Sequence, residues 1–257
     1  MPSDLVIPLG GLYAFLLVFV RVAGVFTFLP IPGVTAGPAA ARVVLALAFT
    51  LALAPRWPAI DPGGVILSTL IAWIIAEAAL GLAAGILVGM MAEVVVMGTQ
   101  ILGFQAGYGY ASTIDPNTQA DSGILLVLAQ LFAGLLFFAF GWDRQVILIF
   151  ANSLQSHPPG TWTPSVSMAE EIIRAGSSIF SVGLRLAMPV AGMLLLVDLT
   201  LALVGRINAQ VQMITIAFPL KMVLALLMLS WTLVAYPQMY EQQAVRLLTL
   251  MSKLIAH

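Results

Sequence analysis

Residues 167–206 read SMAEEIIRAGSSIFSVGLRLAMPVAGMLLLVDLTLALVGR, and the length of this segment indicates that the chain does not consist of simple membrane crossings. Ser167 and Glu170 form a Ser-x-x-Glu capping box, which predicts the first turn of an α-helix. No strong stop signal follows before Arg206, so the pattern predicts one helix, kinked at Pro189. At about 1.5 Å per residue, this helix is nearly twice as long as a bilayer core of roughly 30 Å is thick. It must therefore project from the bilayer, tilt strongly or break.

The composition of the whole chain excludes most soluble classes of protein. Its 257 residues are 61% hydrophobic and 8% charged, and the mean hydropathy is +1.06. A soluble fold of this size cannot hide so much apolar surface. The formal net charge of −1 leaves no basic surface for nucleic acid. Cysteine is absent, and His157 and His257 are far apart in the sequence, so we predict no metal and no other cofactor.

Long apolar runs recur along the chain. Because they are continuously apolar and do not alternate, they favour helices over the strands of a membrane barrel. About six segments are expected at roughly 20 residues per crossing, and the third is long enough for two passes or one long bent element. The chain is therefore predicted to be an all-α integral membrane protein. The runs are Leu9–Leu29, Ala39–Ala54, Val65–Tyr110, Gly123–Ala151, Ser177–Val204 and Ile214–Tyr236.

Several ionisable residues lie inside these apolar runs. In lipid, each would cost a few kcal/mol or more unless it were paired or hydrated. They could pair with one another or reach the helix ends, or their helices could be buried in a larger assembly with a polar interior. Both interpretations predict that Glu77 and Arg185 do not face lipid. The residues are Arg21, Glu77, Glu93, Arg185, Asp198 and Lys221.

Small residues recur every fourth position in the third run. Each step of four turns a helix about 40° past a full circle, so the glycines form a slowly drifting stripe for close helix packing. The glutamates at the two ends of the series come out about 160° apart, which excludes a shared carboxylate site. The series is Glu77, Gly81, Gly85, Gly89 and Glu93.

A glycine-rich aromatic segment, GFQAGYGYA at 103–111, is followed by STIDP at 112–116. It lacks the Lys-Ser/Thr ending of a phosphate-binding loop and the preceding strand of a dinucleotide fold. The remaining interpretations are a glycine-packed helix end or an irregular loop at membrane depth. Irregular backbone is tolerated there only where protein covers it or where it lines a cavity.

The segment from Glu241 to His257 is amphipathic, with one apolar helical face. Such a face predicts either a helix lying on the membrane or docking on a partner protein. The residues of the face are Ala244, Leu247, Leu248, Met251, Leu254 and Ile255.

Three groups of residues give the chain a family resemblance. The first group is Arg21-Val22-Ala23-Gly24-Val25-Phe26 with Pro30, Pro38, Arg42 and Pro55. The second group is Glu77, Gly81, Gly85, Gly98, Gln100, Gly103, Gln105, Gly107 and Asp115-Pro116. The third group is Ala217-Phe218-Pro219-Leu220-Lys221. In this order and spacing, the chain resembles the FliR family, the T-type component of type III export. It departs from the family at Gly141-Trp142-Asp143-Arg144, where the family usually has a histidine, so no role of that histidine is carried over.

The resemblance implies a gate subunit and not an enzyme. Bent helical hairpins would assemble with P-type and Q-type (FliP-like and FliQ-like) subunits into a channel in the bacterial inner membrane, at the flagellar basal body. FlhB-like and FlhA-like components would join it, and unfolded flagellar proteins would pass through it. The chain itself would divide into a P-like part, 1–165, and a Q-like hairpin and tail, 166–257.

The resemblance also implies a plug loop at about Gly107 to Ser122. Aromatic and apolar side chains there could close a narrow lumen by excluding water. The residues assigned to this plug or constriction are Phe104, Gly107, Tyr108, Gly109, Tyr110, Ile114, Asp115 and Pro116.

Two other functions remain open from the sequence. One is the counterpart of this gate in a virulence injectisome, which shares the motifs. The other is a small-molecule or ion transporter, in which helices broken at Pro189 and Pro219 would place Arg185, Asp198 and Lys221 around a midplane site.

Overall fold

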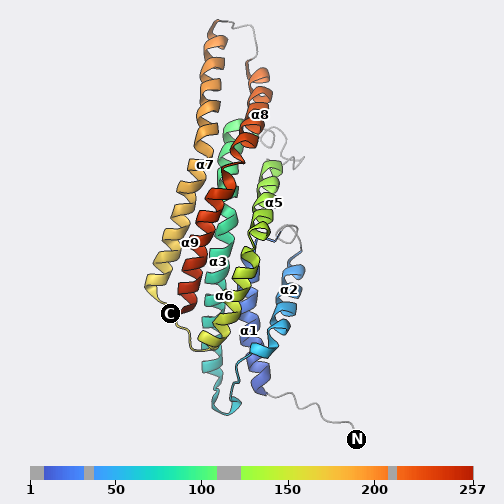
Figure 1. Ribbon diagram of the computed structural model, residues 1–257, viewed down its shortest axis with the longest axis vertical. Helices are drawn as coiled ribbons and strands as arrows, with labels where there is room; N and C mark the ends of the chain where they lie inside the picture. Colours follow the sequence, from blue (N-terminus) through green and yellow to red (C-terminus); the bar gives the residue numbers. More distant parts are fainter. Residues whose placement is uncertain (1–8, 32–37, 109–122, 208–212, 257) are drawn as a thin grey trace. The chain divides into compact units, whose positions relative to one another are not determined.

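The computed structural model describes residues 9–31, 38–108, 123–207 and 213–256. Within these ranges the chain is helical and contains no strand, which confirms the all-α prediction (Figure 1). The helices are α1 (Leu9–Phe28), α2 (Ala39–Ala52), α3 (Leu67–Ala106), α5 (Gly123–Ala139), α6 (Trp142–Ser156), α7 (Val166–Ile207), α8 (Met213–Thr232) and α9 (Tyr236–Ala256), with short 3-10 turns η1 (Ala54–Arg56) and η2 (Pro62–Gly64).

Three of these helices are long and apolar enough to cross a membrane: α1, α3 and α7. Two bent pairs of helices also qualify if each pair is one span, which gives up to five candidates among the described residues. The run at 65–110 folds as one helix of 40 residues and not as two passes. The predicted helix at 167–206 is confirmed, because α7 runs unbroken over 42 residues.

The fourth apolar run is broken near its middle. α5 ends at Ala139, Gly141 takes a positive φ of 69°, and α6 begins at Trp142. The two helices are bent by 67° at this point. A positive φ is available to glycine at little cost, so Gly141 allows the chain to turn between the two helices.

Internal contacts divide the chain into two units. Unit 1 comprises residues 1–90, 137–175 and 244–257, and unit 2 comprises residues 91–136 and 176–243. The helices α3, α5, α7 and α9 each contribute one part to unit 1 and the other to unit 2. The boundary expected between the P-like and Q-like parts, after residue 165, lies inside unit 1.

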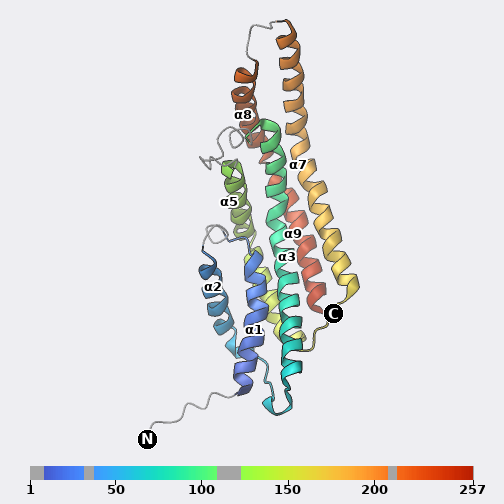
Figure 2. The same cartoon turned by 180° about the vertical axis from the view of Figure 1, so that it is seen from behind.

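In unit 1, α1 lies between α2 and the first part of α3 (Figure 2). Its inward face is apolar apart from Arg21, and Leu17, Val18 and Val22 are completely buried. The end of α9 belongs to the same unit, where the indole nitrogen of Trp162 donates to the carbonyl of Leu254.

The predicted placement of the amphipathic C-terminal segment is therefore wrong. All six residues of its apolar face are at most 6% exposed, and they are buried within the chain itself. Burial of an apolar helical face is favourable against any apolar surface, whether a membrane, a partner protein or the same chain. Packing on the same chain avoids the entropy cost of association with a second molecule.

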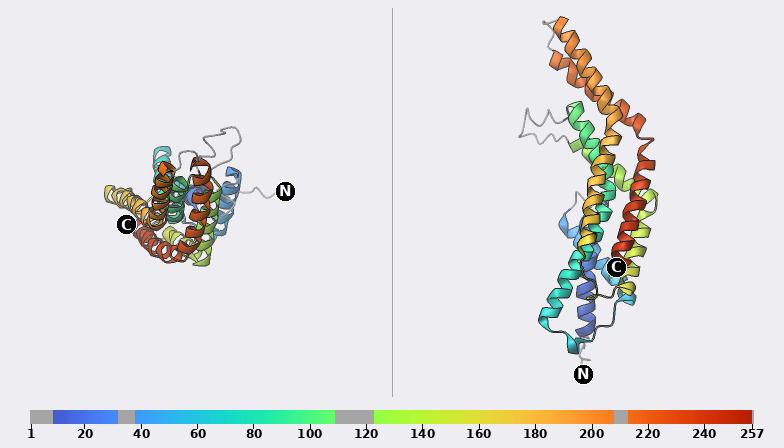
Figure 3. Two further views of the ribbon diagram at one scale, coloured as in Figure 1. Left: turned by 90° about the horizontal axis from the view of Figure 1, so that it is seen from above. Right: turned by 90° about the vertical axis from the view of Figure 1, so that its left-hand side faces the viewer.

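In unit 2, the end of α3, the second part of α7 and α8 share one hydrophobic core. Its buried members are Leu102, Ala106, Ala187, Val190, Leu194 and Ala225. Figure 3 shows α8 running beside α7 in this unit. Gly98 of α3 and Gly183 of α7 face each other, because a Cβ on Gly183 would lie 3.2 Å from the Gly98 nitrogen and 2.8 Å from the Met97 side chain.

Candidate functional site

A completely buried ion pair lies in unit 1. Arg21 on α1 and Glu77 on α3 are both 0% exposed. Arg21 Nη2 donates to Glu77 Oε1 at 2.9 Å, and Arg21 Nε pairs with Oε2, so the contact is bidentate. The planar guanidinium fork matches a carboxylate in this way and fixes its orientation. The pair thereby ties α1 to α3.

The remaining hydrogen-bonding groups of this pair bind the end of α6 and the loop that follows it. Arg21 Nη1 donates to Ser153 Oγ at 3.2 Å and to the Ser153 carbonyl at 3.3 Å, and Nη2 donates to the His157 carbonyl at 3.1 Å. Glu77 Oε1 also accepts from the Gly160 backbone N–H at 3.0 Å. Such partners matter because removing two charged groups from water costs free energy, which their mutual attraction offsets only when further hydrogen bonds satisfy their other polar atoms.

Gly160 is the residue that lets this loop close over the pair. Its φ is +91°, and a Cβ would lie 2.6 Å from Cε2 of Trp73. Both the backbone conformation and the space exclude larger residues. The chain therefore presents a backbone N–H to the carboxylate at a place that no side chain could occupy.

The three glycines singled out on α3 all lie against α1. A Cβ on Gly81 would lie 2.3 Å from the Arg21 carbonyl oxygen, and one on Gly85 would lie 2.6 Å from the Gly24 carbonyl oxygen. A Cβ on Gly89 would lie 3.1 Å from Phe28. The close backbone approach brings Arg21 within reach of Glu77, four residues before Gly81.

The beginning of the predicted plug is an ordered helix end in unit 2. Gly107 has a φ of +87°; its N–H donates to the Phe104 carbonyl, and the N–H of Tyr108 donates to the Gly103 carbonyl at 3.0 Å. This is a Schellman cap. A Cβ on Gly107 would meet the ring of Phe218 at 2.6 Å. Residues 103–108 thus follow the glycine-packed helix-end interpretation.

The plug residues differ in where the structure places them. Phe104 is 76% exposed on the last turn of α3. Tyr108 is half-buried, and its hydroxyl donates to the Met222 carbonyl at 3.4 Å. Gly109, Tyr110, Ile114, Asp115 and Pro116 lie outside the described residues.

A second ion pair joins α7 to α8 in unit 2. Lys221 Nζ lies 2.8 Å from Asp198 Oδ1 and 3.0 Å from Oδ2, and the two side chains are 12% and 41% exposed. Arg185 and Glu93 are exposed on this chain, so burial of Arg185 would require a neighbouring molecule.

The structure does not bring Arg185, Asp198 and Lys221 together as the midplane site predicted for a transporter. The helices predicted to break at Pro189 and Pro219 continue through both prolines. Arg185 is exposed and Asp198 is paired with Lys221. Within the residues that the structure describes, no group of three or more His, Cys, Asp or Glu side chains could hold a metal ion.

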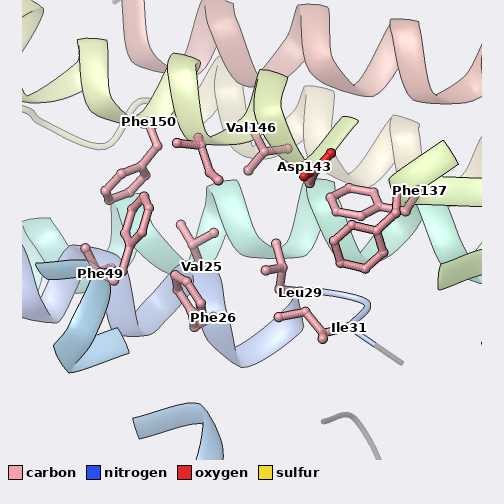
Figure 4. A pocket seen from close by; sticks show the side chains of 12 residues that line it. Val25, Phe26, Leu29, Ile31, Phe49, Phe137, Asp143, Val146 and Phe150 are labelled. Carbon is pink, nitrogen blue, oxygen red and sulfur yellow. The ribbon is translucent and has the colours of Figure 1, made fainter. Parts of the chain in front are cut away.

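Unit 1 also contains an apolar pocket of about 670 Å³, part of which is open to solvent (Figure 4). Side chains from α1, α2, α5 and α6 line it, and the rings of Phe49 and Phe150 lie 6.3 Å apart on one side. Its one carboxylate, Asp143, lies in the first turn of α6, where the helix dipole favours a negative charge. The pocket can hold an apolar group but offers no catalytic constellation.

Comparison with known proteins identifies the family of the chain. The family model of the bacterial export proteins, family 1, matches residues 12–247. The chain belongs to this family. Among curated proteins it is similar to the flagellar biosynthetic protein FliR of Escherichia coli, with 27% identity over 82% of this chain and 80% of the relative. It is also similar to FliR of Bacillus subtilis, 27% identical over 84% of each chain, and of Caulobacter vibrioides, 27% identical over 86% of this chain and 88% of the relative.

Family membership confirms the resemblance drawn from the motifs, which extend from Arg21 to Lys221. The sequence did not identify which charges pair. Arg21 and Glu77 carried a signal, because each is a lone charge of opposite sign in an apolar run. The sequence did not indicate the other members of the site, because they bind the pair largely through backbone groups, which no residue type reveals. These members are Ser153, His157 and Gly160.

Proposed function

We propose that the chain is a core subunit of the flagellar type III protein export gate, the channel that passes unfolded flagellar subunits across the inner membrane. The observation that carries this proposal is the match of the export family to residues 12–247, together with relatives named flagellar biosynthetic protein FliR. The chain's role is structural: it forms part of the wall and closure of a conduit.

Helix length supports an assembly larger than one chain. The 40 residues of α3 and the 42 residues of α7 would each extend about 60 Å, against roughly 30 Å for the hydrocarbon core. Apolar side chains beyond the bilayer need cover from protein. P-type and Q-type subunits, which resemble the N-terminal and C-terminal parts of this chain, are the proposed cover, with FlhB-like and FlhA-like components nearby.

Closure of the channel is assigned to the segment from Gly107 to Ser122. The structure supports a fixed base for it, since the Schellman cap at Gly107 and the packing of that glycine on Phe218 hold the end of α3 in place. The exposed ring of Phe104 lies one turn before this base. An apolar side chain in that position can help to exclude water from a narrow passage.

Purification tests the assembly. A tagged chain, co-expressed with the P-type and Q-type genes of the same genome, should bring small membrane proteins with it in mild detergent. Mass spectrometry should identify them as those subunits. A lone monomer would contradict the gate and favour a transporter. Injectisome subunits in place of flagellar ones would assign the chain to the virulence counterpart.

Deletion of residues 111–119 tests the closure. The complex should still assemble, because the helix cap at 103–108 remains, and membranes should become leaky to small solutes. Gly64→Ala is the control, since a Cβ there has nothing within 4 Å. Unchanged permeability in an intact complex would contradict the plug without affecting the assignment to the gate.

A further inference from the structure

The second part of α7, in unit 2, carries an arginine at each end of an exposed stripe. From Arg185 to Arg206 the helix rises about 31 Å, and the two arginines lie about 60° apart around the helix axis. Both arginines are exposed. On the same side between them lie only apolar residues and one glycine: Met188, Gly192, Leu195, Leu196, Leu199 and Leu203, all exposed.

The length of this stripe matches the thickness of a bilayer core, which is about 30 Å. Among the most apolar stretches of the three long helices, that of α7 is the least covered by the chain itself. In α7, 17% of the residues of this stretch are buried, against 39% in α1 and 39% in α3. Leu196 is 62% exposed and Leu203 is 65% exposed. The stripe is thus long enough to cross the hydrocarbon core once, and it is uncovered over that length.

The chemistry of α7 changes at Arg185. Before it the helix carries Glu170, Glu171 and Arg174, all exposed. After it, and before Arg206, the one charged residue is Asp198. Asp198 lies roughly 110° around the helix from the middle of the stripe, and it is paired with Lys221 of α8. Charge is therefore kept away from the exposed side over the length of the stripe.

The neighbouring helix α8 places an exposed tryptophan close to the level of Arg185. The Lys221–Asp198 contact sets the register of the two antiparallel helices, and equal rise from that contact brings Trp231 opposite Met188. Trp231 is 70% exposed. Tryptophan is enriched at the level of lipid headgroups, as are the long basic side chains that reach them.

We propose that the stripe from Arg185 to Arg206 is a lipid-facing surface of this chain, covered by acyl chains. In this arrangement Arg185, with Trp231, lies in the headgroup layer of one leaflet and Arg206 in that of the other. Each guanidinium pairs with lipid phosphate, for which its geometry is suited. The part of α7 before Arg185 extends into water or protein. The proposal does not rest on the role in export.

The natural chain lacks cysteine, so single-cysteine variants can be spin-labelled selectively. Leu196→Cys and Leu199→Cys probe the stripe, and Ile173→Cys is the matched control, being 70% exposed on the charged part of the same helix. The tagged full chain, with whatever subunits co-purify, is reconstituted in liposomes of phosphatidylcholine and phosphatidylglycerol. Collision rates are measured with oxygen, which dissolves in lipid, and with a water-soluble nickel chelate.

At Leu196 and Leu199 the oxygen rate should exceed the nickel rate severalfold, and at Ile173 this order should reverse. Across labels from Met188 to Leu203 the ratio should peak near Leu195 and fall towards both arginines. Exclusion of both reagents at Leu196 and Leu199 would show that protein covers the stripe and overturn the proposal. So would a dominant nickel rate there, or a maximum displaced to the level of either arginine.

Discussion

The two ion pairs of this chain connect helices in different surroundings. Arg21 and Glu77 are completely buried, and the backbone around residues 153–160 satisfies their other atoms. Lys221 and Asp198 join two neighbouring helices, and the carboxylate is 41% exposed. The first pair connects three segments far apart in the sequence, whereas the second connects the two arms of one hairpin.

The difference shows that burial decides how much stability the fold loses when one member of an ion pair is removed. Removing one member of a buried pair leaves an uncompensated charge without solvent, whereas an exposed partner can turn to water or headgroups. We therefore expect substitutions at the two pairs to differ in cost.

The largest expected effect is at the buried pair. Glu77→Ala should lower the free energy of unfolding by about 3–5 kcal/mol, because Arg21 is left buried and unpaired. Thermal unfolding of the purified chain in detergent, followed by size-exclusion chromatography, measures the loss. The double variant Arg21→Met with Glu77→Leu should recover part of it, since no charge remains. A single variant as stable as the natural chain would contradict the proposed importance of the pair.

Gly81→Ala should have the next largest effect, about 1–3 kcal/mol, because its Cβ would meet the Arg21 carbonyl oxygen at 2.3 Å and force the two backbones apart. The same thermal assay applies. Gly103→Ala on the same helix is the control, since its nearest contact would be an ordinary 3.8 Å. Equal stability of the two variants would show that close approach of α1 to α3 is not required.

Asp198→Asn should cost less, about 0.6 kcal/mol, the average for polar contacts between membrane helices. The amide keeps the shape of the side chain and can still accept a hydrogen bond from Lys221. Unfolding of this variant should be measured beside Glu77→Ala. If Asp198→Asn and Glu77→Ala lower the free energy of unfolding equally, the exposure of an ion pair does not determine its contribution to stability.

The smallest effect is expected at a surface pair on α7. Glu170 and Arg174 are 60% and 78% exposed and 3.6 Å apart, one helical turn from each other. Glu170→Gln should change the free energy of unfolding by no more than about 0.5 kcal/mol, and less at high salt. A shift of several degrees in Tm would show that this turn is covered in the purified protein.

Local signals in the sequence predicted the individual helices well. The 42-residue α7 was evident because apolar residues and a start signal continue without a stop from residue 167 to Arg206. The run at 65–110 was ambiguous, since continuous apolarity does not distinguish one long helix from two; the structure shows one. The break at Gly141 depends on a single backbone conformation that the apolar run concealed.

The sequence by itself determined that this chain is helical and apolar, and that its helix at 167–206 is too long for a simple crossing, because these properties follow from composition, hydrophobic period and local start and stop signals. Only the tertiary structure decided that Arg21 binds Glu77 and that the amphipathic tail packs on its own chain. It also showed that Arg185 and Arg206 bracket one exposed stripe. Pairing and exposure depend on which helices meet and at what register. Those relations join residues distant in the sequence, so no local pattern encodes them.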